Sequence, residues 1–181
     1  MTLDSFNKKV SARQIALVGI MAATLECGKL ALSFLPNIEI VTLLCALYGY
    51  VFGISGVMAT AVFVCIEPLI YGIGSWIVSY FVFWPAVALI FMMLGRRGVK
   101  QRWIFVLTAV LLSVVFGILC SVIDVAFFLG INKYYPKNVL IYYIRGLGFD
   151  IVHIISNFAV FITLFPLLAR KLESIKGTLK L

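Results

Sequence analysis

The residues best suited to chemistry lie in the last apolar stretch of the chain. Asp150, His153 and Asn157 have i, i+3 and i+7 spacing, and Arg145 precedes them. On a helix this spacing places the three side chains on one face, which we expect to line a cavity rather than to touch lipid. Such a face could bind a small polar ligand, exchange protons or contribute to a metal site. Because the chain has a single histidine, the hydrogen-bonding role is favoured over a metal site.

Five of the seven acidic residues fall in or beside five different apolar segments. They are Glu26, Glu39, Glu67, Asp124 and Asp150. A carboxylate at the centre of a bilayer costs about 2.5–3.5 kcal/mol, so such residues are functional candidates by default. We expect each of them in the outward half of its helix, with Asp150 in the opening turns of the last one. Lys29, Arg145 and His153 are their candidate partners; the alternative is that some are interfacial residues that reach water.

Aromatic residues are frequent near the same ends of the segments. They are Tyr71, Trp76, Tyr80, Trp84, Tyr134, Tyr135, Tyr142 and Tyr143. Tyrosine and tryptophan commonly form a belt at the membrane interface. Ligand pockets also combine apolar walls with a few polar groups, so Trp76 and Tyr80 are candidates to stack on a ligand.

The composition requires lipid as the solvent of most of these residues. Of 181 residues, 64% are hydrophobic and 12% are charged, whereas soluble domains carry about 25% charged residues. A spanning helix needs roughly 20 apolar residues, so the chain has room for about six spans. The fold class predicted is an all-α integral membrane protein, a single bundle of six transmembrane helices over residues 1–181.

Turn signals divide the chain into six apolar segments. They run from about 12 to 34, 38 to 52, 57 to 70, 75 to 94, 103 to 129 and 140 to 168. The second and third are short for straight spans, and tilting or shielding by neighbouring helices would explain them. The longest polar loop is expected at 132–138. The first segment lacks a cleavage pattern and is interpreted as a retained helix rather than a signal peptide.

The basic residues set the orientation. With the N-terminus in the cytoplasm, eleven of the fifteen lysines and arginines lie on the inner side. They are Lys8, Lys9, Arg13, Arg96, Arg97, Lys100, Arg102, Arg170, Lys171, Lys176 and Lys180. Because basic residues favour cytoplasmic loops, both termini are predicted to be cytoplasmic.

Small residues form a stripe on the first predicted helix. Ala12, Ala16, Gly19 and Ala23 have i, i+4, i+7 and i+11 spacing. Such a stripe lets another helix approach closely. It serves either packing within this bundle or docking of a partner subunit near the cytoplasmic side.

Several motifs are absent from the sequence. It contains no GxxxxGK[ST] loop for ATP, no HExxH zinc motif and no GxSxG nucleophile motif. The four cysteines lack CxxC spacing and indicate neither a zinc site nor a disulfide framework. We therefore expect no catalytic residue, no metal and no cofactor in this chain.

With these features the chain resembles the substrate-binding S component of energy-coupling factor (ECF) transporters, which import vitamins. The resemblance covers nearly the whole chain. It is carried by the size, the six spans, the segment ALVGIMAA at 16–23 and the loop LPNIEIVT at 35–42. The small-residue stripe is similar to the family's docking motif, although Gly19 departs from a pure alanine pattern.

The resemblance implies that the chain binds a vitamin from outside and topples in the bilayer to deliver it. Its implied partners are a transmembrane coupling subunit and two cytoplasmic ATPases, which use the ATP, in the plasma membrane of a prokaryote. The family's pocket is built mainly from helices four to six and the outer loops. Here it implicates Asn37, Glu39, Tyr71, Trp76, Tyr80, Asp124, Arg145, Asp150, His153 and Asn157.

The solute and the mechanism are left with alternatives. The loop at 35–42 looks most like members linked to cobalamin uptake, whereas the mixture of acids, arginine and aromatics also suits a pyrimidine or another heterocycle. The five membrane carboxylates allow a self-sufficient proton-coupled transporter. A membrane enzyme or maturation factor that uses Asp150 and His153 is the third hypothesis.

Overall fold

A computed structural model describes residues 11–36 and 38–178, and within them the chain is all-helical. The seven helices are α1 (Ala12–Ala31), α2 (Val41–Phe52), α3 (Ile54–Tyr71), α4 (Trp76–Arg96), α5 (Arg102–Phe128), α6 (Tyr135–Thr163) and α7 (Phe165–Thr178). Helix α1 begins at a capping box, in which Ser11 Oγ accepts from the Gln14 backbone N–H at 3.2 Å and Gln14 Oε1 accepts from that of Ser11 at 3.0 Å. These bonds satisfy donors that a helix start leaves free.

Five helices are long and apolar enough to cross a membrane. They are α1, α3, α4, α5 and α6, with 20, 18, 21, 27 and 29 residues. Large apolar side chains also cover the outside of the bundle; Leu69 and Leu111 are 84% and 64% exposed. An apolar exterior of this kind matches a lipid environment, where exposure of leucine carries no hydration cost. The chain is therefore compatible with a multi-pass membrane protein.

Helix α2 is the exception among the six predicted spans. Its 12 residues cover about 18 Å, less than the ~30 Å of a hydrocarbon core. It lies in the middle of the bundle and buries nine of its 12 residues, which is the shielding by neighbours expected for a short segment. It packs most extensively on α4. At the contact the backbone of Ala88 leaves no room for a side chain on Gly49, so only glycine permits this approach.

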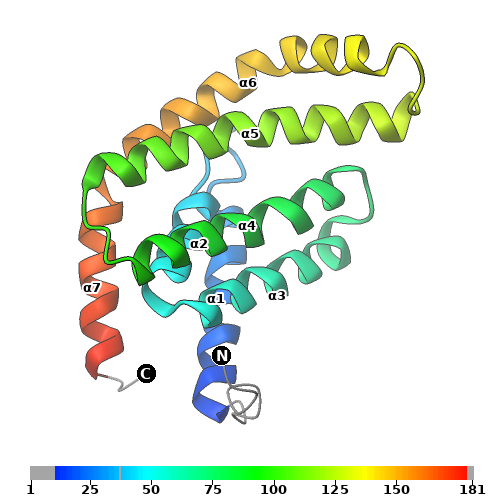
Figure 1. The fold of residues 1–181 in the computed structure, drawn as a ribbon. Coiled ribbons are helices and arrows are strands. Elements are labelled where there is room, and N and C mark those ends of the chain that lie inside the picture. The colour runs from blue at the N-terminus through cyan, green and yellow to red at the C-terminus, as the bar shows by residue number, and fades with distance from the viewer. Residues whose placement is uncertain (1–10, 37, 179–181) are drawn as a thin grey trace, which may run out of the picture.

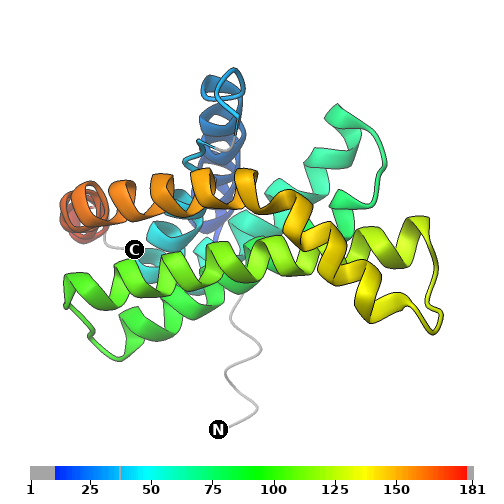
Figure 2. The same ribbon diagram turned by 90° about the horizontal axis from the view of Figure 1, so that it is seen from above.

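The longer helices form two antiparallel hairpins. Figure 1 shows α3 with α4 and α5 with α6, and both hairpin turns lie at the same end of the molecule. The connection between α4 and α5 lies at the opposite end, and α1 runs steeply across the hairpins. Figure 2 shows α5 and α6 crossing each other, and they make the most extensive helix pair. The bundle therefore has two distinct ends.

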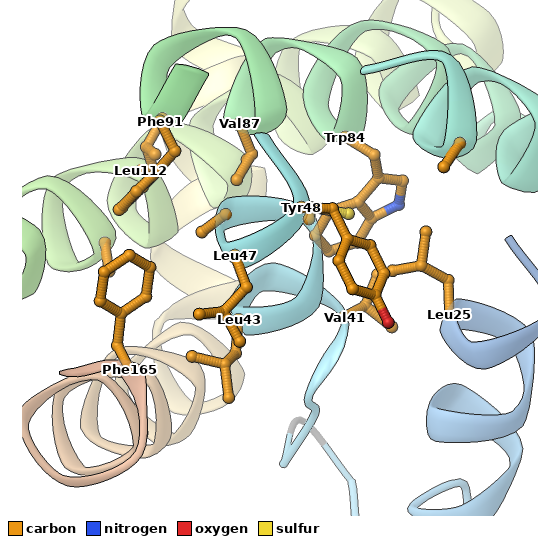
Figure 3. Close-up of a cluster of buried hydrophobic side chains, with 14 of the residues drawn as sticks. Leu25, Val41, Leu43, Leu47, Tyr48, Trp84, Val87, Phe91, Leu112 and Phe165 are labelled. Carbon is orange, nitrogen blue, oxygen red and sulfur yellow. The ribbon is translucent and has the colours of Figure 1, made fainter. Parts of the chain in front are cut away.

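Aromatic rings fill the end of the bundle near α7. We call Tyr50, Phe91, Phe105, Phe161 and Phe165 the aromatic core. Phe165 lies at its centre, with ring centres at 4.5 Å from Phe105, 5.4 Å from Phe91 and 5.4 Å from Phe161. Figure 3 shows Phe165 on one side of the buried cluster and Tyr48 and Trp84 on the other.

The last predicted segment, 140–168, was wrong at its start and in its continuity. Helix α6 begins at Tyr135, because proline is tolerated in the first turn of a helix, where Pro136 lies. The predicted loop at 132–138 is correspondingly shorter. The helix then ends at Thr163, and α7 starts at Phe165. Pro166 has no backbone N–H to continue the ladder of α6, and Figure 1 shows α7 turning sharply away.

Candidate functional site

A cavity of about 180 Å³ opens between the two hairpins. Each helix from α1 to α6 contributes at least one residue to its wall, and so does the connection between α1 and α2. It is lined by Lys29, Leu32, Ser33, Leu35, Ile38, Glu39, Val41, Phe63, Tyr80, Trp84, Phe116 and His153. The wall is mostly apolar and aromatic, with a few polar groups at fixed positions. This is the usual construction of a small-molecule site.

Helix α4 supplies the aromatic part of the wall. Trp76, Tyr80 and Trp84 have i, i+4 and i+8 spacing, so they lie in a row along one face of the helix. The ring centres lie 5.0 Å apart for Trp76 and Tyr80 and 5.4 Å apart for Tyr80 and Trp84, both in edge-to-face geometry. Phe116 of α5 continues the wall at 5.7 Å from Trp84. The His153 ring stands at 82° to that of Phe116, with centres 5.6 Å apart. Tyr80, Trp84 and Phe116 thus offer flat apolar surface to a planar solute.

Glu39 fastens the connection between α1 and α2 to the rest of the bundle. Its Oε2 accepts from the backbone N–H of Thr42 at 2.8 Å, in the first turn of α2. Its Oε1 accepts from Thr42 Oγ1 at 2.5 Å, from His153 Nε2 at 3.0 Å and from Asn157 Nδ2 at 3.3 Å. Asn157 also donates to Ser113 Oγ at 3.0 Å, which extends the network to α5.

The charge of Glu39 is favoured by this environment. Burial raises the pKa of the carboxyl group, but the hydrogen bond and positive charge of His153 and the two hydrogen bonds from Thr42 outweigh burial and hold the pKa of Glu39 below its ordinary value. A negative charge at a helix N-terminus is also stabilised by the helix dipole. Glu39 therefore serves as an anionic anchor, with His153 presented beside it in the cavity wall.

The second polar group of the cavity is built on α1 and α3. Lys29 forms an ion pair with Glu67, whose side chain is fully buried. The Lys29 ammonium also lies 3.8 Å from the ring centre of Tyr71, 5.4 Å from that of Tyr80 and 5.7 Å from that of Trp76. Rings within about 6 Å attract a cation through their negative faces. Tyr71 in turn donates to Glu26 Oε1 at 2.7 Å.

Two other membrane carboxylates lie away from the cavity wall. Asp124 accepts from Ser75 Oγ at 2.6 Å, just before α4 begins. Asp150 contacts α5 at Gly117, where a side chain on residue 117 would meet the carboxyl group. Asp150 is near the middle of the 29-residue α6, so its predicted place in the opening turns was wrong. The cause is the earlier start of α6 at Tyr135.

The predicted binding residues divide into three groups. Glu39, Tyr80 and His153 line the cavity. Asn157 is not part of the lining but donates a hydrogen bond to Glu39. Tyr71 and Trp76 surround Lys29 without lining the cavity, and Asp124, Arg145 and Asp150 lie outside its wall. Arg145 is exposed and makes no ion pair with the acids in the described ranges, so its expected pairing with them was wrong. Asn37 lies outside the described residues.

Several lining residues were absent from the predicted site. The sequence indicates Lys29 only as a counter-ion and Trp84 only as one of the aromatic group near the outer ends, and it indicates no role for Phe63 and Phe116. The spacing of Trp84 four residues after Tyr80 is a usable signal for the shared face. Phe63 and Phe116 carry no such signal, because their neighbours along the helices are equally apolar.

The small-residue stripe of α1 faces outward. Ala12, Ala16, Gly19 and Ala23 are all exposed. A side chain added at Gly19 would meet no atom within 4 Å. Within the described part of the chain, the stripe therefore takes no part in packing of this bundle. Of the two uses predicted for the stripe, packing inside the bundle is wrong.

Comparisons with family models, with curated proteins and with solved structures found no match to this chain.

Proposed function

We propose that the chain is the membrane-embedded, substrate-binding subunit of a micronutrient importer of the energy-coupling factor type. The observation that carries the proposal is the cavity, whose wall draws on all of α1 to α6 and combines aromatic faces with Lys29 and the Glu39–His153 pair. A site assembled from so many helices is typical of proteins that hold a solute within a bundle.

The proposed topology has six membrane segments, with α2 as the short one, and both termini in the cytoplasm. The connection between α4 and α5 is flanked by Arg96, Arg97, Lys100 and Arg102, which favours the cytoplasmic side. The connection between α1 and α2, which lines the cavity, then lies on the external side. A solute would enter the cavity from outside a prokaryotic plasma membrane.

The dimensions of the cavity favour a small solute. Its volume of about 180 Å³ is below the range of about 300–1,000 Å³ for pockets that hold drug-sized ligands. Cobalamin is far larger than such ligands, so the cavity favours the alternative of a pyrimidine or a comparable planar heterocycle. The flat wall of Tyr80, Trp84 and Phe116 would then stack on the ring.

Partner subunits would supply the energy. The sequence has no phosphate-binding loop, and a coupling subunit with two ATPases would drive toppling of the solute-loaded chain. The exposed stripe on α1 supports a docking role, because small residues let helices approach closely in a membrane. No enzymatic activity is proposed for this chain.

The experiment is identification of the small molecule that stays bound through purification, by mass spectrometry. Tyr80→Ala removes a lining ring and should reduce the retained solute by about tenfold, as expected for loss of about 1.4 kcal/mol of stacking. Tyr134→Ala, at a side chain that is 57% exposed, is the matched control. Equal retention in wild type and Tyr80→Ala would contradict binding in this cavity.

A reconstitution experiment tests the division of labour. Vesicles that contain this chain alone should not accumulate the identified solute. Vesicles that also contain the coupling subunit and the ATPases should accumulate it only with ATP. Full accumulation by the lone chain would contradict the subunit role.

A self-sufficient proton-coupled transporter is the second candidate. It is favoured by the grouping of Glu26, Glu67 and Lys29 beside the cavity. Dissipation of the proton gradient should then abolish uptake by the lone chain, whereas insensitivity to an uncoupler would eliminate this candidate.

A further inference from the structure

Two carboxyl groups meet beside the cavity, and each has one satisfied and one unsatisfied oxygen. Glu26 Oε1 accepts from Tyr71, and Glu67 Oε2 pairs with Lys29. Glu26 Oε2 and Glu67 Oε1 are both sealed from water and have no hydrogen-bond partner in the described ranges. Glu26 and Lys29 are three residues apart on α1, and Glu67 and Tyr71 are four residues apart on α3. The Lys29 ammonium lies 3.8 Å from the ring centre of Tyr71, so the two cross-links bring both carboxyl groups to the same place between α1 and α3. Two neighbouring carboxyl groups therefore each have a buried acceptor without a donor.

This arrangement is unfavourable if both groups are ionised. A buried acceptor that lacks a donor costs about 1–3 kcal/mol. Two carboxylates in contact also repel each other, which is why paired carboxyl groups in other proteins hold a common proton. One proton placed between Glu26 Oε2 and Glu67 Oε1 replaces the repulsion and both unsatisfied acceptors with a single hydrogen bond.

The surrounding groups do not supply this hydrogen. On α1 the only basic neighbour is Lys29, which is engaged by the other oxygen of Glu67. On α3 the hydroxyl of Tyr71 is donated to Glu26 Oε1. On α2 the hydroxyl of Tyr48 is paired with Thr24 at 2.6 Å. On α4, Tyr80 is the remaining titratable neighbour, and its hydroxyl forms no hydrogen bond with either carboxyl group in the described part of the chain.

Across the cavity, Glu39 and His153 form a separate pair. A metal ion is a poorer occupant than a proton for the two free oxygens. Within the described residues, no group of three or more acidic, histidine or cysteine side chains is arranged to hold a metal. Calcium and magnesium ions need several oxygen ligands, and two free oxygens are too few.

We propose that Glu26 and Glu67 hold one proton between them at neutral pH. Lys29 then balances the one remaining negative charge, so this end of the cavity has no net charge. A solute anion at Lys29 would have to displace Glu67 into a dry environment, whereas an uncharged solute can accept a hydrogen bond from Lys29 without breaking the ion pair. The preference for an uncharged solute rests on the proposed binding function; the shared proton does not.

Infrared spectroscopy of the purified full-length chain tests the proton directly. Wild type at neutral pH should show a carbonyl band of a non-ionised carboxyl group that shifts in heavy water. Both E26Q and E67Q should remove this component, because the remaining carboxylate needs no proton beside an amide and Lys29. The double variant should lose no more than either single one, since the pair holds one proton.

Asp150→Asn and Glu173→Gln are the controls, the first for another membrane carboxyl group and the second for an exposed one on α7. They should leave the component in place. A wild-type spectrum without it, or a component that survives both E26Q and E67Q, would overturn the proposal. If E67Q fails to fold, E26Q still decides the question, because its amide can take the place of the protonated group.

The solute retained by the wild type tests the consequence for the cavity. An uncharged molecule supports it, and an anion overturns the stated preference. Purification without any retained solute counts against the proposed function. The infrared result still decides whether Glu26 and Glu67 share a proton.

Discussion

The cavity and the aromatic core are both built from aromatic side chains, but the rings fill the space in the aromatic core and leave space open at the cavity. In the aromatic core, α2, α4, α5, α6 and α7 each contribute one ring, and Phe91, Phe161 and Phe165 are fully buried. The hydrophobic cluster that contains them also includes Leu43, Leu47 and Val87, all fully buried. At the cavity, Tyr80, Trp84 and Phe116 leave open volume and share the wall with Lys29 and Glu39.

This difference separates stability from binding. Close packing of rings at one end brings dispersion and burial without a polar cost. At the other end, each polar group needs a partner, and Glu39 and Lys29 obtain theirs from different helices. A bundle anchored at the aromatic core can tolerate incomplete packing around a solute site. The predictions below test this separation.

Phe165→Ala should have the largest effect on stability. It removes the central ring of the aromatic core, and truncation of a buried phenylalanine costs about 3–5 kcal/mol. The free energy of unfolding in mild detergent measures the loss, while solute retention by the folded fraction should stay unchanged. Phe128→Ala, at a side chain that is 64% exposed, is the control. A small loss for Phe165→Ala would show that the two ends do not differ in their contribution to stability.

Glu39→Ala should affect both properties. It leaves Thr42, His153 and Asn157 without their common acceptor. Loss of the hydrogen bond to the first turn of α2 and of two further hydrogen bonds gives a cost of about 2–3 kcal/mol. The solute should also be lost, because the connection that lines the cavity is no longer fastened to α6. Unfolding in detergent and retained solute are the two measurements. Unchanged retention would mean that the cavity keeps its shape without this anchor.

The sequence predicts the helical segments well, because a long apolar run has few other interpretations, and five of the resulting helices are long and apolar enough to cross a membrane. The same uniformity hides which side of each helix faces inward. Phe63 and Phe116 line the cavity, yet nothing in their sequence neighbourhood distinguishes them from lipid-facing phenylalanines. In a soluble helix the polar face would have supplied this information.

Polar residues were more informative where they are rare. His153 and Asn157 were predicted on one face of the last helix, and both are buried toward Glu39. Their partner could not be predicted, since the pairing joins residues 114 and 118 positions apart. The position of Asp150 was missed because Pro136 was interpreted as part of a loop, whereas it lies in the first turn of α6.

The stability of the wild type should fall at acidic pH through Glu39. Its pKa in the folded state is lower than in the unfolded chain, where a glutamate titrates near about 4.3. The stabilisation is therefore complete above this value and is lost as the pH falls through the lower pKa of the folded state. The difference in unfolding free energy between wild type and Glu39→Gln should shrink over this interval. The corresponding difference for Glu173→Gln should stay small. A wild-type advantage that is already lost above the pH at which an unfolded glutamate titrates, or that is the same at every acidic pH, would contradict the role of the charge.

Arg145→Ala should have the smallest effect, and it defines the limit of the cavity. The sequence suggested Arg145 as a binding residue, but its side chain is exposed and lies outside the cavity wall. Surface substitutions usually change stability by less than about 0.5 kcal/mol, and solute retention should equal that of wild type. Lys29→Met replaces a lining cation with an uncharged side chain of similar length, and it should reduce retention in the same assay. A loss in Arg145→Ala as large as that in Lys29→Met would extend the site beyond this cavity along α6, and the division between a packed end and a binding end would have to include that surface.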